Sequence, residues 1–367
     1  MTADTPSPKY PVFDGHNDVV GRYFKPGISY DFFQRNDPKI AHIDLPRTKE
    51  GGFAGGFFAV YAGAKPKKRQ PKKDMFSRHL TENGYSVPLP PPLKWDWAMQ
   101  TTTAQMNRLF QVERDSAGQF QFCRTVDEIE ACIANGTLAA ILHIEGAEAI
   151  DPDLNALEVF YQAGLRSVGP VWSRGNIFAE GVPFVFPALP DTGPGLTDAG
   201  KALVKRCNEL GILIDLSHMN EAGFWDVAKL SDAPLVATHS NVHALCQSTR
   251  NLTDKQLDAI KESDGMVGLN FAVGFLREDG GNGVDTPLDV LVRHIDYLVE
   301  RLGVERVGFG SDFDGATMPQ DLSGVEKVQN LVEALRKAGY DHDALNKITH
   351  QNWLRVLRKT WQSNVLS

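Results

Sequence analysis

Five side chains that commonly bind metal ions stand at the ends of apolar stretches scattered over most of the chain. They are His16 and Asp18 in VFDGHND, Glu145 in AAILHIEG, His218 in GILIDLSH and His239 in PLVATHS. Imidazole nitrogens and carboxylate oxygens are the usual ligands of zinc and similar ions. No local loop can gather residues so far apart in the sequence. The pattern therefore predicts a fold that brings the carboxyl ends of several strands together around a metal site.

The number of these ligands predicts two ions rather than one. Three imidazoles and two carboxylates exceed what a single zinc ion needs. Glu145 lies on a strand between the H-x-D strand and the two histidine strands, so it is the natural bridge between the ions. A hydroxide formed from water between two Lewis acids near neutral pH could attack a polarised carbonyl group. The mixture of nitrogen and oxygen ligands favours zinc, with cobalt and manganese as alternatives.

Three further residues could act beside such a centre. Asp312, in GFGSDFDG, is a candidate proton shuttle or anchor for an ammonium group, or else a turn aspartate. Arg250, in TRNLT, could hold a carboxylate through two hydrogen bonds, or could lie on the surface. His143 alternates with Glu145 along one run, so we expect it to face the same side and to support the ligands.

The elements that must position these residues are eight short apolar runs with the character of buried strands. Helical spacing of apolar residues follows most of them, as in 153–164, 198–211 and 286–303, and residues 251–265 begin with a capping Thr253. An eightfold alternation of strand and helix predicts a parallel α/β fold, specifically a (β/α)8 TIM-type barrel. The eight runs are residues 12–18, 53–62, 139–146, 166–173, 211–218, 234–240, 265–273 and 306–315.

Residues 63–125 interrupt this alternation. They contain a basic run at 65–74, the stretch VPLPPPLKWDW and a helical pattern at 99–113. Clustered prolines exclude a central strand, and a basic run is typically a solvated loop. We expect an insertion between the second and third strands of a single domain spanning residues 1–367.

Composition limits the partners and the compartment. The net charge of −8 and the pI near 5.7 argue against nucleic acid or an anionic membrane as a partner. Four cysteines without a C-x-x-C pair indicate a reducing compartment and buried thiols. The first residues lack the apolar core of a signal peptide, and the last lack a hydrophobic anchor tail. The sequence therefore predicts a cytoplasmic protein.

Five motifs, in their order along the chain, resemble a known family. DGHND, IEG, DLSH, THS and SDFDG are similar to those of the membrane (renal) dipeptidases, a family of zinc peptidases, over about Pro11 to Leu357. The resemblance implies a (β/α)8 barrel with two zinc ions that hydrolyses dipeptides, including those with a C-terminal D-residue. It also implies a homodimer.

The resemblance assigns a role to each candidate. Asp312 would hold the free amino group of the substrate and handle the proton passed to the leaving amine, and Arg250 would hold the free carboxylate. One zinc ion would be bound by His16 and Asp18 and the other by His218 and His239, with Glu145 between them.

One position departs from the family pattern. On the fourth strand the family usually has a histidine that contacts the substrate carbonyl, whereas this chain has Trp172. An indole supplies one N–H donor and a large apolar face. The donor could be Trp172 itself, Arg174 or Asn176, or zinc could stabilise the oxyanion alone, and Trp172 could merely pack.

Two other functions remain open at this level. A second kind of metal-dependent amide hydrolase on the same barrel would cleave an N-acyl amino acid or a cyclic amide. A barrel that binds metal or peptide without catalysis is the other alternative. The complete ligand set argues against the non-catalytic barrel, and an aspartate paired with an arginine favours a substrate with a free amine and a free carboxylate.

Overall fold

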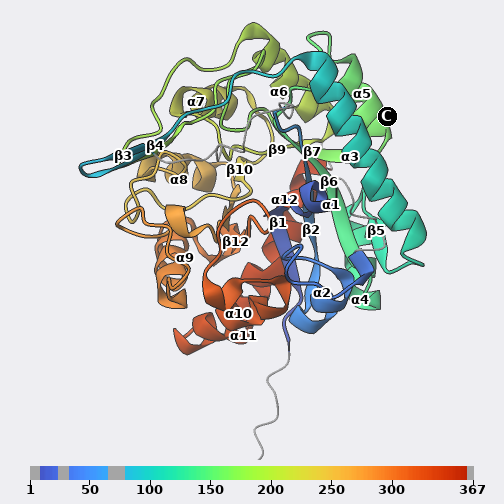
Figure 1. Cartoon of the computed structure of the whole chain (residues 1–367), viewed down its shortest axis with the longest axis vertical. Helices are drawn as coiled ribbons and strands as arrows, with labels where there is room; N and C mark the ends of the chain where they lie inside the picture. Colours follow the sequence, from blue (N-terminus) through green and yellow to red (C-terminus); the bar gives the residue numbers. More distant parts are fainter. Residues whose placement is uncertain (1–8, 24–32, 65–78, 362–367) are drawn as a thin grey trace, which may run out of the picture.

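Eight parallel strands form a nearly closed barrel at the centre of the computed structural model, which describes residues 9–23, 33–64 and 79–361 (Figure 1). Each predicted apolar run overlaps one of these strands, so the predicted TIM-type barrel is confirmed. The barrel strands are β1 (Val12–Asn17), β2 (Phe53–Tyr61), β6 (Leu138–Glu145), β7 (Leu165–Gly169), β9 (Leu213–Ile214), β10 (Val236–Ala237), β11 (Met266–Leu269) and β12 (Val307–Phe309).

The order of the strands shows how the ring closes. The path of paired strands runs β10-β11-β12-β1-β2-β6-β7-β9, and every pair along it is parallel. A parallel bridge between Asp215 and Val236 then joins β9 to β10, and the Leu216 amide donates to the Val236 carbonyl at 2.8 Å. All eight carboxyl ends consequently surround one opening.

Helices cover the outside of the barrel (Figure 1). The predicted helices at 153–164, 198–211, 251–265 and 286–303 are all present, and Thr253 occupies the N-cap of its helix as expected. Gly211 ends another helix at a φ of 68°, a left-handed conformation that glycine adopts without strain. The helices are α1 (Val19–Tyr23), α2 (Leu45–Gly51), α3 (Trp95–Asp115), α4 (Val126–Asn135), α5 (Asn155–Gln162), α6 (Asp198–Leu210), α7 (Glu221–Leu230), α8 (Asp254–Glu262), α9 (Leu288–Leu302), α10 (Val328–Lys337), α11 (His342–Asn346) and α12 (Asn352–Trp361).

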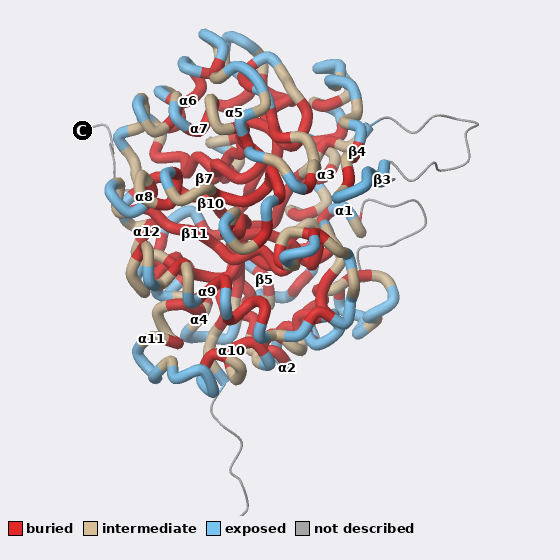
Figure 2. The backbone as a smooth tube through the Cα atoms, turned by 90° about the vertical axis from the view of Figure 1, so that its left-hand side faces the viewer, coloured by how far each residue is buried: buried red, intermediate tan, exposed pale blue. Residues whose placement is uncertain are grey.

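The barrel interior is packed with side chains and is not an open channel. Phe13, Phe57 and Met266 belong to one buried cluster with Trp353 of α12, whose indole nitrogen donates to the Phe309 carbonyl at 3.0 Å. A Cβ atom at Gly15 would lie 2.4 Å from the Trp353 ring, so β1 needs a glycine there. Figure 2 shows this buried interior inside a shell of partly exposed helices. Because the interior is filled, chemistry is confined to the rim.

Between β2 and β6 the described chain contains a hairpin of β3 (His79–Thr81) and β4 (Gly84–Val87), then α3 and β5 (Phe120–Phe122). The hairpin pairs with β8 (Phe184–Phe186) in a separate antiparallel sheet, and β5 adds to β6. The predicted helical pattern at 99–113 lies within α3, which begins four residues earlier and ends two residues later. The predicted loop at 65–74 lies outside the described residues, as do most of the N-terminal segment and the last six residues.

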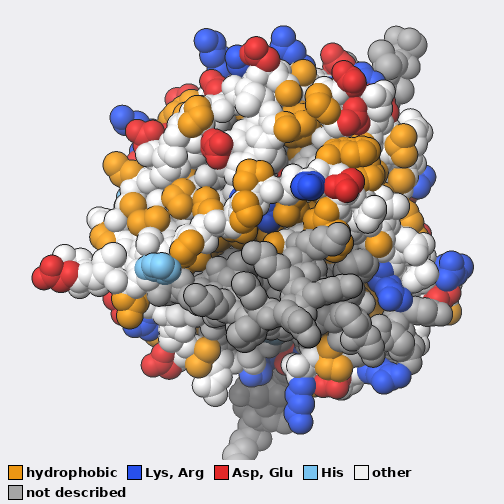
Figure 3. Space-filling model, turned by 45° about the horizontal axis from the view of Figure 1, so that its top comes forward, with side chains coloured by type: hydrophobic (Ala, Val, Ile, Leu, Met, Phe, Trp, Pro, Cys, Tyr) orange, Lys and Arg blue, Asp and Glu red, His pale blue; other side chains and the backbone are white. Residues whose placement is uncertain are grey.

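The structure bears on the expectations about the cysteines and about the charge of the surface. The four cysteines are buried free thiols, and the face in Figure 3 mixes acidic, basic and hydrophobic side chains. None of the helices in the described ranges has the length and apolar character needed to cross a membrane.

Candidate metal centre

The carboxyl ends of β1, β6, β9 and β10 bring the five predicted ligands into one buried cluster. Glu145 Oε1 is central to it: it lies 3.1 Å from His218 Nε2 and 3.7 Å from the Nε2 atoms of both His16 and His239. Asp18 Oδ2 is 3.4 Å from His16 Nε2, and the Nε2 atoms of His218 and His239 are 3.1 Å apart. Side chains separated by more than half the sequence thus face one another across a few ångströms.

The backbone at these strand ends is irregular where it aims the ligands. The pairing of β1 with β2 shifts between Asp14 and Asn17, and Asn17 donates its side-chain amide to the Phe57 carbonyl at 3.1 Å. His218 has a φ of 69° and Asp312 a φ of 60°. Such left-handed backbone is uncommon for residues other than glycine and is found preferentially at functional sites.

The shifted pKa values in the cluster indicate that a bound positive charge would stabilise its buried carboxylates. Burial, reinforced by repulsion from Asp18, holds the pKa of Glu145 well above its usual range. Burial opposes protonation of His16, yet the attraction of Glu145 and Asp18 outweighs it and raises the His16 pKa to about 10. Burial lowers the pKa values of His218 and His239, which keeps both rings neutral and able to bind a metal. A bound cation would compensate the buried carboxylates.

The donor set fits metal ions. Neither ring nitrogen of His16 has a hydrogen-bond partner among the described residues, although the ring is fully buried. A buried polar group without a partner is costly and is often explained by an ion. Three groups of potential ligands have donor atoms within 4.8 Å of one another: Glu145, His218 and His239; His16, Asp18 and Asp312; and His16, Asp215 and His239.

Hydrogen bonds orient the histidines from behind, through residues that the sequence analysis missed. The Ser173 hydroxyl lies 2.6 Å from His218 Nδ1, and the Thr238 hydroxyl lies 2.8 Å from His239 Nδ1 while donating to Asp215 at 2.6 Å. Partners of this kind fix the ring orientation of metal-binding histidines. Asp215 had a sequence signal, because it is a lone carboxylate in the apolar run GILIDLSH. Ser173 and Thr238 had none.

His143 does face the cluster, as its alternation with Glu145 predicts. It is fully buried, with Nδ1 2.9 Å from the Ser167 hydroxyl and Nε2 3.8 Å from Asp215, and its ring meets His16 edge-on. Burial lowers its pKa to about 3. It is therefore a neutral ring packed behind the ligands.

Asp312 and Arg250 lie beside the cluster and are next to different candidate ligands. The Asp312 carboxylate is grouped with His16 and Asp18 and accepts a hydrogen bond from Asn270 at 2.9 Å. Burial, and after it repulsion from Asp18, raises the Asp312 pKa to about 7. The Arg250 guanidinium is buried, donates to the His239 carbonyl at 3.2 Å, and leaves its Nε without a partner among the described residues. A negative and a positive side chain therefore flank the candidate metal centre.

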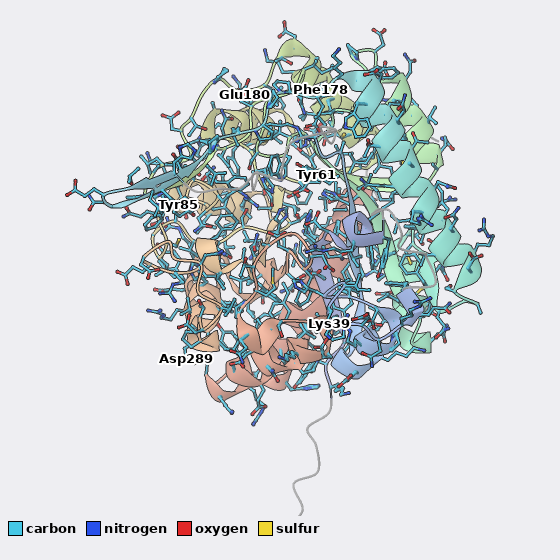
Figure 4. The ribbon with its side chains drawn as sticks, in the orientation of Figure 1. Lys39, Tyr61, Tyr85, Phe178, Glu180 and Asp289 are labelled. Carbon is cyan, nitrogen blue, oxygen red and sulfur yellow. The ribbon has the colours of Figure 1, made fainter. Side chains whose placement is uncertain are left out.

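The structure also shows how Trp172, Arg174 and Asn176, the three candidate donors to the oxyanion, are placed. Each guanidinium nitrogen of Arg174 donates a hydrogen bond: to Glu148 at 2.6 Å, to the hydroxyl of Tyr61, which is labelled in Figure 4, at 3.0 Å, and to the Ala62 carbonyl. The Asn176 side-chain amide donates to the Pro170 carbonyl at 2.8 Å and stabilises its own loop. Trp172 is buried with its ring 5.8 Å from that of His218. Of the three side chains considered, only Trp172 packs against a candidate ligand.

A parallel barrel that gathers histidines and carboxylates at its carboxyl rim has the architecture of a metal-dependent barrel enzyme. Residues 6–365 match the model of the membrane dipeptidase family, peptidase family M19, and the chain belongs to this family. The predicted family is therefore confirmed. Because its relatives of known structure are metallopeptidases, membership implies a metal cofactor.

Three relatives illustrate the similarity. Dipeptidase AC, a metallopeptidase of known structure, is 49% identical with a TM-score of 0.91, over 96% of this chain and 99% of that one. A Rhodobacter sphaeroides metallopeptidase, liganded with a phosphinate mimic of the dipeptide L-Ala-D-Ala, is also 49% identical with a TM-score of 0.91, over 96% and 100% of the two chains. An uncharacterized Klebsiella pneumoniae protein in the pqqA 5′ region is 50% identical over 258 residues, 70% of this chain and 95% of that protein.

Proposed function

We propose that this protein hydrolyses dipeptides, including those with a C-terminal D-residue, at a centre of two zinc ions. One ion would be held by His16 and Asp18, the other by His218 and His239, and Glu145 would contact both. The central position of Glu145 Oε1 among the three imidazoles supports the bridging role. When bound, the ions would act as Lewis acids that polarise the scissile carbonyl and lower the pKa of a bound water.

The observation that carries the choice of substrate is the pair of opposite charges beside the cluster. A free dipeptide has an ammonium group on its first residue and a carboxylate on its second, so the two charges are close together. Asp312 lies next to His16 and Asp18, and Arg250 donates to the carbonyl of His239. A short zwitterion could therefore span the ligands with both ends bound, and a longer peptide would lose one of these contacts. The dipeptide mimic bound to the Rhodobacter sphaeroides relative supports the same class of substrate.

Each side chain then has a defined task. Arg250 would bind the substrate carboxylate with its planar guanidinium, and Asp312 would bind the ammonium group. The leaving amine needs a proton when the C–N bond breaks, and the attacking water must lose one. Asp312, whose pKa is raised to about 7, could accept the proton from water and return it to that nitrogen. Asn270 would keep the carboxylate aimed at the site.

A comparison of substrate analogues tests this function against the rival amide hydrolase. We expect metal-loaded protein to cleave L-Ala-L-Ala or L-Ala-D-Ala at least about a hundredfold faster, by kcat/KM, than N-acetyl-alanine or alanyl-alanine amide, because each analogue leaves a buried charged side chain unpaired. Release of free alanine, followed by chromatography, measures all four rates. Faster cleavage of N-acetyl-alanine would instead establish the rival function.

Three broader predictions remain part of the proposal. We propose a single domain with an insertion at 63–125, a cytoplasmic location and a homodimer. The first rests on the break in the strand–helix alternation, the second on composition, and the third on the family resemblance.

A further inference from the structure

An aromatic surface adjoins the candidate metal centre on the side of Arg250 and His218. We call it the aromatic wall and define it as Trp172, Phe184 and Phe275. The Phe184 ring stacks on Phe275 with centroids 6.0 Å apart and meets Trp172 edge-on at 5.5 Å. Phe184 also meets the His218 ring at 6.1 Å, and the Arg250 guanidinium lies 5.4 Å from the centre of Phe275. The wall therefore runs from a candidate metal ligand to the proposed carboxylate-binding residue.

The wall is held in place by the small sheet outside the barrel. Val185, next to Phe184 in β8, exchanges hydrogen bonds with Thr249, the residue before Arg250, at 3.1 and 3.2 Å. The hydroxyl of Tyr85 in β4, which is labelled in Figure 4, donates to the Gly274 carbonyl at 3.4 Å, in the turn that carries Phe275. One short strand thus fixes Phe184 and the Arg250 loop relative to each other. Such fixed contacts are what a specificity pocket needs.

Two members of the wall retain exposed surface. Phe184 and Phe275 are half-buried, whereas Trp172 is almost fully buried. Half-buried rings beside a reaction centre can gain contact area when a ligand side chain covers them. Of these two rings, Phe275 lies 5.4 Å from the guanidinium that would hold the substrate carboxylate.

We infer that the aromatic wall binds the side chain of the C-terminal residue of the dipeptide and selects uncharged, apolar side chains there. The inference rests on the proposed function. A side chain and a carboxylate on the same α-carbon lie within a few ångströms of each other, so a carboxylate on Arg250 places that side chain against Phe275 and Phe184. A charged side chain at this position would lose its hydration against rings that cannot pair with it. Phe184 is the central contact, because it touches both other members.

The test uses five dipeptides that differ only in the C-terminal residue: L-Ala-Gly, and L-Ala-Leu and L-Ala-Asp with the leucine or aspartate in either configuration. For the wild-type protein we expect kcat/KM for the better leucine isomer to exceed that for either aspartate isomer at least about tenfold. Phe184→Ala should lower kcat/KM for that leucine substrate about tenfold, mainly through KM, and change L-Ala-Gly less than about threefold, because glycine has no side chain to contact the wall.

Phe186→Leu is the matched control. Phe186 lies in the same strand, but its ring stacks on Tyr85, with centroids 6.0 Å apart, and not on a member of the wall. It should lower the melting temperature without changing the ratio of leucine to glycine substrates. Equal loss on both substrates in Phe184→Ala would show that Phe184 only supports the fold, and equal rates for leucine and aspartate in the wild type would overturn the selectivity. Failure to cleave even L-Ala-Gly would instead contradict the proposed function itself.

Discussion

His218→Ala is expected to reduce the metal content from about two ions to about one per chain and to lower kcat by about a thousandfold or more. His218 Nε2 is 3.1 Å from both Glu145 Oε1 and His239 Nε2, so its loss opens the most compact part of the cluster. Metal content by plasma emission spectrometry and dipeptide turnover measure the two effects.

The fold should survive this substitution. The left-handed backbone at a φ of 69° is strained for histidine as well as for alanine, so the substitution adds little backbone strain. The Ser173 hydroxyl loses a partner, so the melting temperature should fall while unfolding stays cooperative. His79→Ala, an exposed histidine in β3, is the control and should keep both ions and full activity. Global unfolding of His218→Ala would show that this histidine serves the structure rather than a metal.

Asp312→Asn is expected to lower kcat for L-Ala-L-Ala by about a hundred- to ten-thousandfold, the range of general acid–base catalysis. The amide cannot transfer the proton and cannot attract the ammonium group, although it fills the same space beside Asn270. Steady-state kinetics over a range of substrate concentrations separates the loss of kcat from the loss of binding.

Asp314→Asn provides the matched control on the same loop. Asp314 pairs with Arg22 at 3.0 Å and accepts from the His42 amide, so its substitution should destabilise the fold but change kcat less than about threefold. Equal turnover by Asp312→Asn and the wild type would remove Asp312 from the reaction and favour a substrate without a free amine.

The barrel was predictable because each strand is buried on both sides and therefore reads as an apolar run. Its parallel order follows from the helices between those runs. The carboxyl ends of parallel barrel strands lie on one rim, so polar residues at these ends, such as His16, Glu145 and His239, must lie near one another. For this reason the ligands could be predicted from the sequence. Their separations and the bridging position of Glu145 required the structure.

The surroundings of the cluster were much less predictable. Ser173 and Thr238 are ordinary polar residues, and only their contacts with His218 and His239 distinguish them. Phe184 lies in the short strand β8, within a segment whose sequence has no periodicity, and its position depends on pairing between β4 and β8, which are about one hundred residues apart. Long-range pairing of this kind has no local signature.

We propose that this chain cleaves dipeptides through metal ions held by His16, Asp18, Glu145, His218 and His239. The most direct measurement is the rate of L-Ala-L-Ala, L-Ala-D-Ala and D-Ala-L-Ala hydrolysis before chelation, after chelation and after zinc is restored. We predict loss of activity on chelation and recovery when about two zinc ions per chain are bound. Unchanged hydrolysis by fully chelated protein, or no hydrolysis of any of the three dipeptides by protein carrying two ions, would contradict it.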